Sequence, residues 1–181
     1  SDTCLRILKR RKATSNPYSC QRNIIYTDRI SADVYFQRME TKRMYNYERQ
    51  VKYYETDKMG VVHHSNYIRW FEEARVEFMR DNDISYRHME EEGIQIPVVS
   101  VSCKYKSPAK FDDDVIVKTW IKKFNGIIIE LAYEVVDKND GQIRVTGESS
   151  HCFVDDKTFK PINLKRERED LYNRFEKAAE E

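Results

Sequence analysis

The segment YYETDKMGVVHHSNY, residues 53–67, gathers an acid, a glycine, two adjacent histidines and an asparagine. Asp57 carries a carboxylate that is ionised at neutral pH, so it can serve as a general base or as a nucleophile. Gly60 indicates a loop, and an amphipathic run follows it. The first backbone amides of a helix lack intrahelical partners and can hold a developing oxyanion. The segment is therefore a candidate catalytic site, a candidate metal site, or only the loop that begins a helix.

The two adjacent histidines, His63 and His64, are weak candidates for metal ligands. Adjacent side chains generally point apart, and neither an HExxH motif nor a close cysteine pair accompanies them. We therefore expect no metal and no cofactor. His63 is interpreted as a surface or supporting residue, and the His64 side chain as a hydrogen-bonding group or as pocket lining. His88 and His151 lack any motif and are interpreted as structural.

The strongest helix pattern of the chain runs over residues 65–81. Four apolar residues fall on one face at helical spacing: Tyr67, Phe71, Ala74 and Phe78. Ser65 or Asn66 can supply the oxygen that caps the first turn. For the charged residues Glu73 and Arg75, we expect a structural ion pair rather than a catalytic role. Tyr67 and Trp70 are expected in the core or in a pocket wall.

Alternating apolar residues predict β-strands in the rest of the chain. These are expected at 45–56, 94–106, 114–124, 127–137 and 142–155, with a short helix at 85–91. Asn125-Gly126 is a hairpin signal, and Gly147 indicates a bulge or a close approach of the backbone.

The predicted order is one strand, a long helix and four strands joined largely as a meander. No βαβ alternation is present, so we expect an α+β domain in which one helix covers an antiparallel sheet. One helix covers only one face of five strands and leaves an open sheet edge. Both features favour a dimer.

The 181 residues suit a single domain with or without a tail. Residues 1–43 hold ten Lys or Arg and four Asp or Glu, a net charge of +6, whereas the whole chain carries +1. We expect a basic, poorly ordered extension at 1–43, a folded domain at 44–165 and a C-terminal helix at 166–181. A basic tail could touch nucleic acid or anionic lipid, but a solvated extension is the simpler expectation.

Composition also restricts the location and the partners of the protein. No apolar stretch approaches ~18 residues, so we expect no membrane span. The four cysteines lie far apart without a CxxC pair, which argues against a zinc ribbon or a disulfide framework. We expect reduced thiols, a cytoplasmic location and no nucleic-acid partner.

The residues around the long helix resemble the hotdog-fold acyl-CoA thioesterases of the 4-hydroxybenzoyl-CoA thioesterase type. The matching positions are Tyr54, Asp57, Gly60, Val62, His64, Asn66, Tyr67, Trp70, Glu73, Ala74 and Arg75. A second matching block is YKSPAKFDD at 105–113, and the likeness covers about residues 45–165. The resemblance implies a hotdog fold, in which a five-stranded antiparallel sheet wraps one long central helix. It also implies active sites between subunits of a homodimer, which can pair into a homotetramer.

The resemblance further implies hydrolysis of an acyl-CoA to free acid and CoA. It gives Asp57 the role of base or nucleophile and the His64 amide that of oxyanion donor. The implied substrate-binding residues are Gly60, Val61, Asn66 and Tyr67, with Asn66 equally a candidate helix cap. Three lysines are candidate contacts for the CoA phosphates: Lys104, Lys106 and Lys110.

Two other function classes stay open. A hotdog domain can bind acyl-CoA as a sensor without hydrolysing it. A dehydratase or hydratase needs acid–base partners for a hydroxyacyl chain, and the segment around Asp57 resembles the hydrolase pattern instead. The acyl group, aliphatic or aromatic, is not determined by the sequence.

Overall fold

The computed structural model of the chain describes residues 44–180. The extension predicted at 1–43 lies outside these residues. The described elements are β1 (Tyr45–Gln50), the 3-10 helix η1 (Tyr53–Glu55), α2 (His64–Asp81), α3 (Tyr86–Glu91), β2 (Ile94–Gln95), β3 (Val98–Tyr105), β4 (Asp114–Phe124), β5 (Ile128–Asp137), β6 (Ile143–Cys152), β7 (Val154–Asp155), α4 (Leu164–Glu167) and α5 (Glu169–Glu180).

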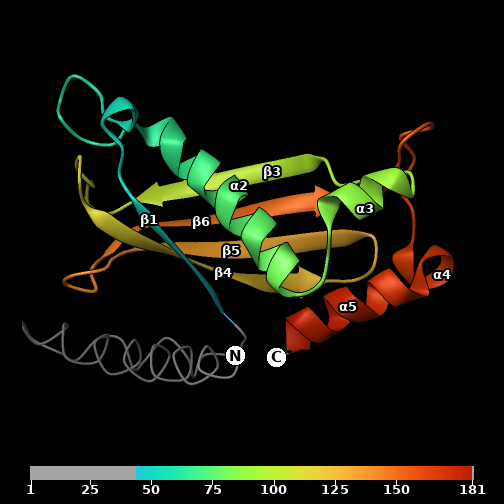
Figure 1. The fold of residues 1–181 in the computed structure, drawn as a ribbon. Helices are drawn as coiled ribbons and strands as arrows, with labels where there is room; N and C mark the ends of the chain where they lie inside the picture. Colours follow the sequence, from blue (N-terminus) through green and yellow to red (C-terminus); the bar gives the residue numbers. More distant parts are fainter. Residues whose placement is uncertain (1–43, 181) are drawn as a thin grey trace, which may run out of the picture. The chain divides into compact units, whose positions relative to one another are not determined.

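Five strands form one antiparallel sheet in the order β1-β4-β5-β6-β3, and α2 lies across one face of it (Figure 1). The predicted α+β architecture, one long helix against a five-stranded antiparallel sheet, is confirmed. The predicted meander holds only for β4, β5 and β6. Strand β3 pairs with β6 instead of β4, which makes β1 and β3 the two edges of this sheet.

The first strand is shorter than the predicted segment 45–56. It ends at Gln50, and residues 53–55 form the 3-10 turn η1. The Glu55 carboxylate accepts a hydrogen bond of 2.7 Å from the Lys52 amide and turns the chain back on itself. Tyr53, expected to continue the alternation of the strand, is therefore exposed.

Helix α2 packs on the sheet through the face predicted from its spacing. Phe71 stacks on Tyr133 of β5, with ring centroids 4.4 Å apart and planes inclined by 13°. A Cβ atom built on Gly147 of β6 would lie 2.3 Å from the Phe71 ring. The close approach predicted at Gly147 is confirmed, because only a residue without a side chain leaves room for this ring.

The β4–β5 hairpin and the C-terminal helix meet at one end of the sheet. Asn125 Oδ1 accepts hydrogen bonds from the amides of Ile127 and Ile128, and Gly126 adopts φ +81°. Helix α5 buries Phe175 against Phe124, with ring centroids 5.4 Å apart. The turn predicted at Asn125-Gly126 thus forms a hairpin, and α5 packs against it.

Candidate active site

The N-terminus of α2 is capped by His63. Its Nδ1 atom accepts a hydrogen bond from the Ser65 amide at 3.4 Å and lies 2.8 Å from the Ser65 hydroxyl. The prediction that Ser65 or Asn66 supplies the cap is therefore wrong. Asn66 is buried, and its side-chain amide donates to the Glu55 carbonyl at 2.7 Å. That contact holds the Asn66 side chain against η1 and not at the helix cap.

Asp57 begins a tight loop that leads into α2. Its amide donates to the Val61 carbonyl, and its own carbonyl accepts from the Gly60 amide, both at 2.9 Å. Gly60 has φ +74°, a left-handed conformation that glycine adopts without strain. Asp57 Oδ1 accepts a hydrogen bond of 2.8 Å from the Met59 amide. Within residues 44–180, Oδ2 has no hydrogen-bond partner, so this oxygen is available for chemistry.

The second block of the sequence motif lies directly against this loop. The Val62 amide donates to the Ala109 carbonyl at 2.8 Å, and Val61 forms a β-bridge with Lys110. The Ala109 amide in turn donates to the Tyr67 hydroxyl at 3.2 Å. The Pro-Ala step therefore contacts both the loop that follows Asp57 and Tyr67 of α2.

Together these segments enclose a pocket of about 280 Å³. Its lining residues are Asp57, Met59, Val61, Val62, His64, Tyr67, Tyr105, Lys106, Ser107 and Pro108. Of the predicted site residues, Asp57, His64, Val61 and Tyr67 come together here. Neither Gly60 nor Asn66 lines the pocket. Gly60 shapes the loop, and the buried Asn66 side chain bonds to the Glu55 carbonyl, so this geometry does not support the substrate contact predicted for Asn66.

Two tyrosines form the aromatic wall of the pocket. Tyr105, at the end of β3, donates its hydroxyl to the His64 carbonyl at 3.2 Å, and its ring centroid lies 5.7 Å from that of Tyr67. Burial raises the pKa of Tyr67, and burial together with the Cys103 thiol raises the pKa of Tyr105 to about 12. Both hydroxyls therefore stay protonated at neutral pH and cannot act as bases there. No role was predicted for Tyr105, although it stands at the strand end just before the Pro-Ala step.

A buried carboxylate, Glu55, contacts several segments around the start of α2 without lining the pocket. Its Oε1 accepts hydrogen bonds from Arg49 Nη2 at 2.5 Å and from Trp70 Nε1 at 2.8 Å. The Arg49 guanidinium lies 4.4 Å above the Trp70 ring. Glu55 is only 4% exposed, and its carbonyl also accepts from the His63 amide. This residue joins β1 to the start of α2, a role that the sequence motif did not predict.

The ion pair predicted between Glu73 and Arg75 is wrong, because residues two apart on a helix face different directions. Glu73 instead accepts from Arg49 at 2.5 Å and from Tyr47 at 3.1 Å. Arg75 points to the opposite side, where its Nε donates to the Tyr86 hydroxyl at 2.9 Å.

Arg75 also reaches His151, which is fully buried in the sheet. Its Nη1 lies 3.2 Å from His151 Nε2, and the Ser149 hydroxyl lies 2.8 Å from the same nitrogen. Burial and then the Arg75 charge lower the pKa of His151 to about 4. A neutral imidazole at this depth supports the structural interpretation of His151.

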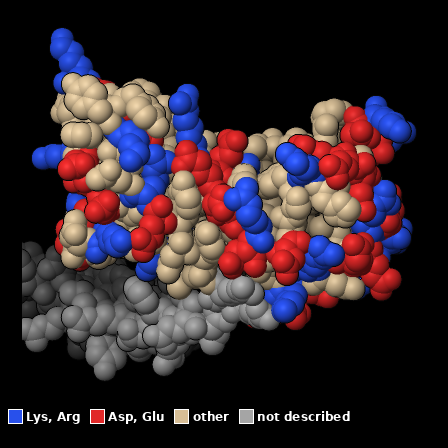
Figure 2. Space-filling model, in the orientation of Figure 1, with Lys and Arg blue, Asp and Glu red and all other residues tan. Residues whose placement is uncertain are grey.

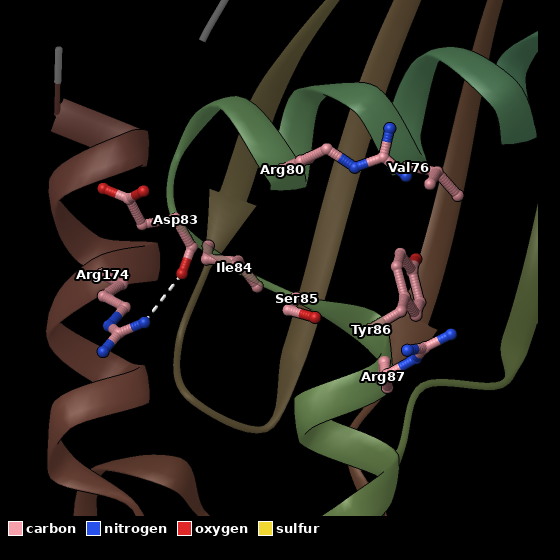
Figure 3. Close-up of a pocket in the computed structure, with 8 residues that line it drawn as sticks. All are labelled: Val76, Arg80, Asp83, Ile84, Ser85, Tyr86, Arg87 and Arg174. Carbon is pink, nitrogen blue, oxygen red and sulfur yellow. Dashed lines mark hydrogen bonds between the residues drawn. The ribbon is translucent and has the colours of Figure 1, made fainter.

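A larger hollow of about 630 Å³ lies at the other end of α2. Figure 3 shows Arg80 of α2, Arg87 of α3 and Arg174 of α5 around it, with the Tyr86 ring between Arg80 and Arg87. Arg174 donates to the Asp83 carbonyl at 2.7 Å. The C-terminal end of α2 presents carbonyl oxygens here, so this helix supplies no free backbone amides for an oxyanion, and the residues of the sequence motif lie at its other end. The smaller pocket at the N-terminus of α2 is therefore the candidate active site.

No group of three His, Cys, Asp or Glu residues in the described part of the chain is arranged to hold a metal ion. None of the helices in it combines the length and the apolar character needed to cross a membrane.

Comparison with known proteins identifies the family. Residues 51–175 match the family model of the thioesterase-like superfamily. This range includes both motif blocks, the positions from Tyr54 to Arg75 and YKSPAKFDD at 105–113. The chain belongs to this superfamily. The predicted resemblance to hotdog-fold thioesterases is thereby confirmed, and so is the prediction of a thioester hydrolase.

Individual relatives of this thioesterase match between two thirds and three quarters of the chain. The putative acyl-CoA thioesterase YneP of Bacillus subtilis (strain 168) is 36% identical over 131 residues, which are 72% of this chain and 94% of that protein. A putative esterase of Aquifex aeolicus (strain VF5) is 36% identical over 121 residues, 67% of this chain and 91% of that protein. The solved structure of the DHNA-CoA thioesterase from Staphylococcus aureus has a TM-score of 0.71 and 35% identity, covering 74% of this chain and 89% of that chain.

Proposed function

We propose that this thioesterase hydrolyses acyl-CoA to a free acid and CoA, in the pocket at the N-terminus of α2. The observation that carries the proposal is that Asp57 and His64, the first residue of α2, line the same pocket. The names of the relatives support a CoA ester as substrate, since YneP is named an acyl-CoA thioesterase and the Staphylococcus aureus protein a DHNA-CoA thioesterase.

In the proposed mechanism, the substrate carbonyl oxygen accepts a hydrogen bond from the His64 amide. That amide begins α2, so it has no intrahelical partner and sits at the positive end of the helix dipole. The carbonyl oxygen gains negative charge as its carbon becomes tetrahedral. Donors already aimed at that oxygen lower the barrier.

Asp57 supplies the second requirement by one of two routes. As a base, its free Oδ2 takes a proton from water while the water oxygen bonds to the carbonyl carbon. As a nucleophile, Oδ2 bonds to that carbon itself, and water then hydrolyses the acyl-aspartyl anhydride. In both routes the C–S bond breaks and the electron pair leaves with sulfur. A thiol with a pKa near ~8.5 leaves without strong acid assistance.

Other residues of the pocket bind and orient the substrate. Val61 and the glycine turn at Gly60 hold the loop beside the thioester, and Tyr67 with Tyr105 packs against the acyl end. Lys106 is the predicted phosphate-binding lysine that lines the pocket, so we assign it the contact with CoA.

The test pairs Asp57→Asn with Asp112→Asn, which alters an exposed aspartate of the neighbouring loop. Loss of the base lowers the rate of thiol release by about a thousandfold in Asp57→Asn. Acyl-CoA affinity and the folded state should stay as in the wild type, and Asp112→Asn should keep full activity. Turnover by Asp57→Asn at the wild-type rate would remove Asp57 from the mechanism. Wild-type protein that binds acyl-CoA without releasing thiol would be a sensor instead.

We propose further that two copies pair through β3. This strand bonds only to β6 within the described sheet, and Val98, Val99 and Val101 on it are 56%, 62% and 41% exposed. An unpaired apolar edge strand is a template for another strand. Val99→Lys should convert the dimer to a monomer in light scattering, whereas an unchanged mass would exclude this edge. The same measurement tests the predicted homotetramer.

The cytoplasmic location remains part of this proposal. Cys103 and Cys152 are free thiols, as expected of a protein in a reducing compartment.

A further inference from the structure

Several large apolar side chains are exposed at the end of the described unit that holds the active-site loop. Tyr53 is 77%, Tyr54 79%, Met59 79% and Phe111 52% exposed. We call these four residues the aromatic tip. The Tyr53 and Phe111 rings are in edge-to-face contact with centroids 5.5 Å apart, and the Val61–Lys110 bridge joins the two segments that carry them.

The aromatic tip protrudes from the fold. Figure 1 shows η1 and the loop after it standing beyond the sheet at the upper left, and Figure 2 shows tan side chains there with Lys or Arg at their margin. Contiguous exposed apolar surface commonly marks a site of interaction with a protein or a membrane. Only Met59 of these four residues lines the catalytic pocket, so the exposure of the other three has no explanation in the proposed chemistry.

Three lysines lie on the same two segments as the aromatic tip. Lys52, Lys58 and Lys110 are exposed, and none of them forms an ion pair with a carboxylate of residues 44–180. The exposed acid next to Phe111, Asp112, accepts a hydrogen bond of 3.0 Å from Gln50. A neutral amide does not cancel the charge of Asp112, so three lysines without an ion pair lie beside one exposed aspartate here.

We propose that the aromatic tip docks on an anionic lipid bilayer. Tyrosine suits the membrane interface, because its ring is apolar while its hydroxyl stays hydrated, and unpaired lysines attract acidic headgroups. A prominence fits a deformable lipid surface better than it fits a preformed protein groove. Docking would present the pocket, through Met59, to acyl-CoA held in the membrane. This last consequence rests on the proposed function, whereas the docking itself does not.

The test measures co-sedimentation of the full chain with phosphatidylcholine vesicles, with and without phosphatidylglycerol. Phe111→Ser and Tyr54→Ser should each weaken binding to the anionic vesicles by about tenfold, because each removes one inserting ring. Phe159→Ser is the matched control, since Phe159 is 63% exposed on the turn after β7, outside the aromatic tip. Lys58→Gln should weaken binding only where phosphatidylglycerol is present.

Residues 1–43 carry a charge of +6 and will also attract acidic vesicles. Comparison of Phe111→Ser with Phe159→Ser isolates the contribution of the aromatic tip, because both variants keep that segment. Equal binding of these two variants to the anionic vesicles would overturn the proposal. Wild-type binding of the same strength with and without phosphatidylglycerol would also overturn it. A change of oligomeric mass in Phe111→Ser would also overturn it by making the tip a contact between subunits. Thiol release from a water-soluble short-chain acyl-CoA should stay unchanged in Phe111→Ser, which separates this proposal from the catalytic one.

Discussion

Gly147 is the residue at which one added methyl group conflicts most directly with the packing of α2 on the sheet. A Cβ built there would lie 2.3 Å from Phe71 Cε2 and 2.8 Å from the Ser102 carbonyl oxygen. The ring is also stacked on Tyr133, the residue of β5 that pairs with Gly147, with centroids 4.4 Å apart. Gly147→Ala must therefore displace a stacked ring, a neighbouring strand or both.

The cost follows from that geometry. Overpacking of a buried site costs about 1–3 kcal/mol, and the backbone clash with Ser102 puts Gly147→Ala near the upper end, at about 3 kcal/mol. With a urea m-value of about 2 kcal/mol/M for a domain of this size, the unfolding midpoint should fall by about 1.5 M. An unchanged m-value would show that stability, and not the compactness of the unfolded state, has changed.

Two variants test the reason for the loss. Gly141→Ala adds a methyl group with no atom within 4 Å, but at φ +71°, so it should cost only about 1 kcal/mol of backbone strain. Phe71→Leu should restore part of the stability of Gly147→Ala, because the two side chains compete for one space. The reasoning fails if Gly147→Ala unfolds at the wild-type midpoint, or if the two mutations are simply additive.

Two further predictions concern buried charge. Burial lowers the pKa of His151 to about 4 in the folded protein, against 6.5 for the free side chain. The unfolded state therefore binds the proton more readily than the folded state does. The free energy of unfolding should be at its full value above pH 6.5 and should fall by about 3 kcal/mol toward pH 4. Urea midpoints measured across this pH range check the loss. In His151→Gln the midpoint should depend less on pH. An equal pH dependence in both proteins would show that other groups cause the loss. Glu55→Gln removes the carboxylate that faces the buried Arg49 guanidinium and should cost about 3 kcal/mol, again read from urea midpoints. Arg49→Met combined with Glu55→Leu should recover most of that cost, and a double variant as unstable as Glu55→Gln would contradict this account.

Local periodicity predicted the elements that pack by a single repeated face. The predicted segment 114–124 coincides with β4, and the predicted helix begins one residue after α2 does, since in both the buried side chains recur at a regular spacing. Contacts between distant segments could not be predicted in this way. Asn66 does not cap α2 because a carbonyl eleven residues earlier accepts from its side chain, and the first strand ends early because Glu55 turns the chain. The pairing of β3 with β6 likewise depends on the order of the complete sheet.

The candidate site shows the same division. Asp57, Val61, His64 and Tyr67 are close in sequence, so one motif was enough to predict that they meet in a pocket. Tyr105 lines the pocket from a separate strand, β3. No local sequence pattern predicts its ring contact with Tyr67.

The most direct test of the central claim is the structure of Asp57→Asn bound to an intact acyl-CoA. The account predicts the thioester carbonyl oxygen at about 3 Å from the His64 amide nitrogen, with the residue 57 side chain beside the carbonyl carbon. An acyl-CoA bound with its thioester elsewhere, such as among Arg80, Arg87 and Arg174, would contradict it.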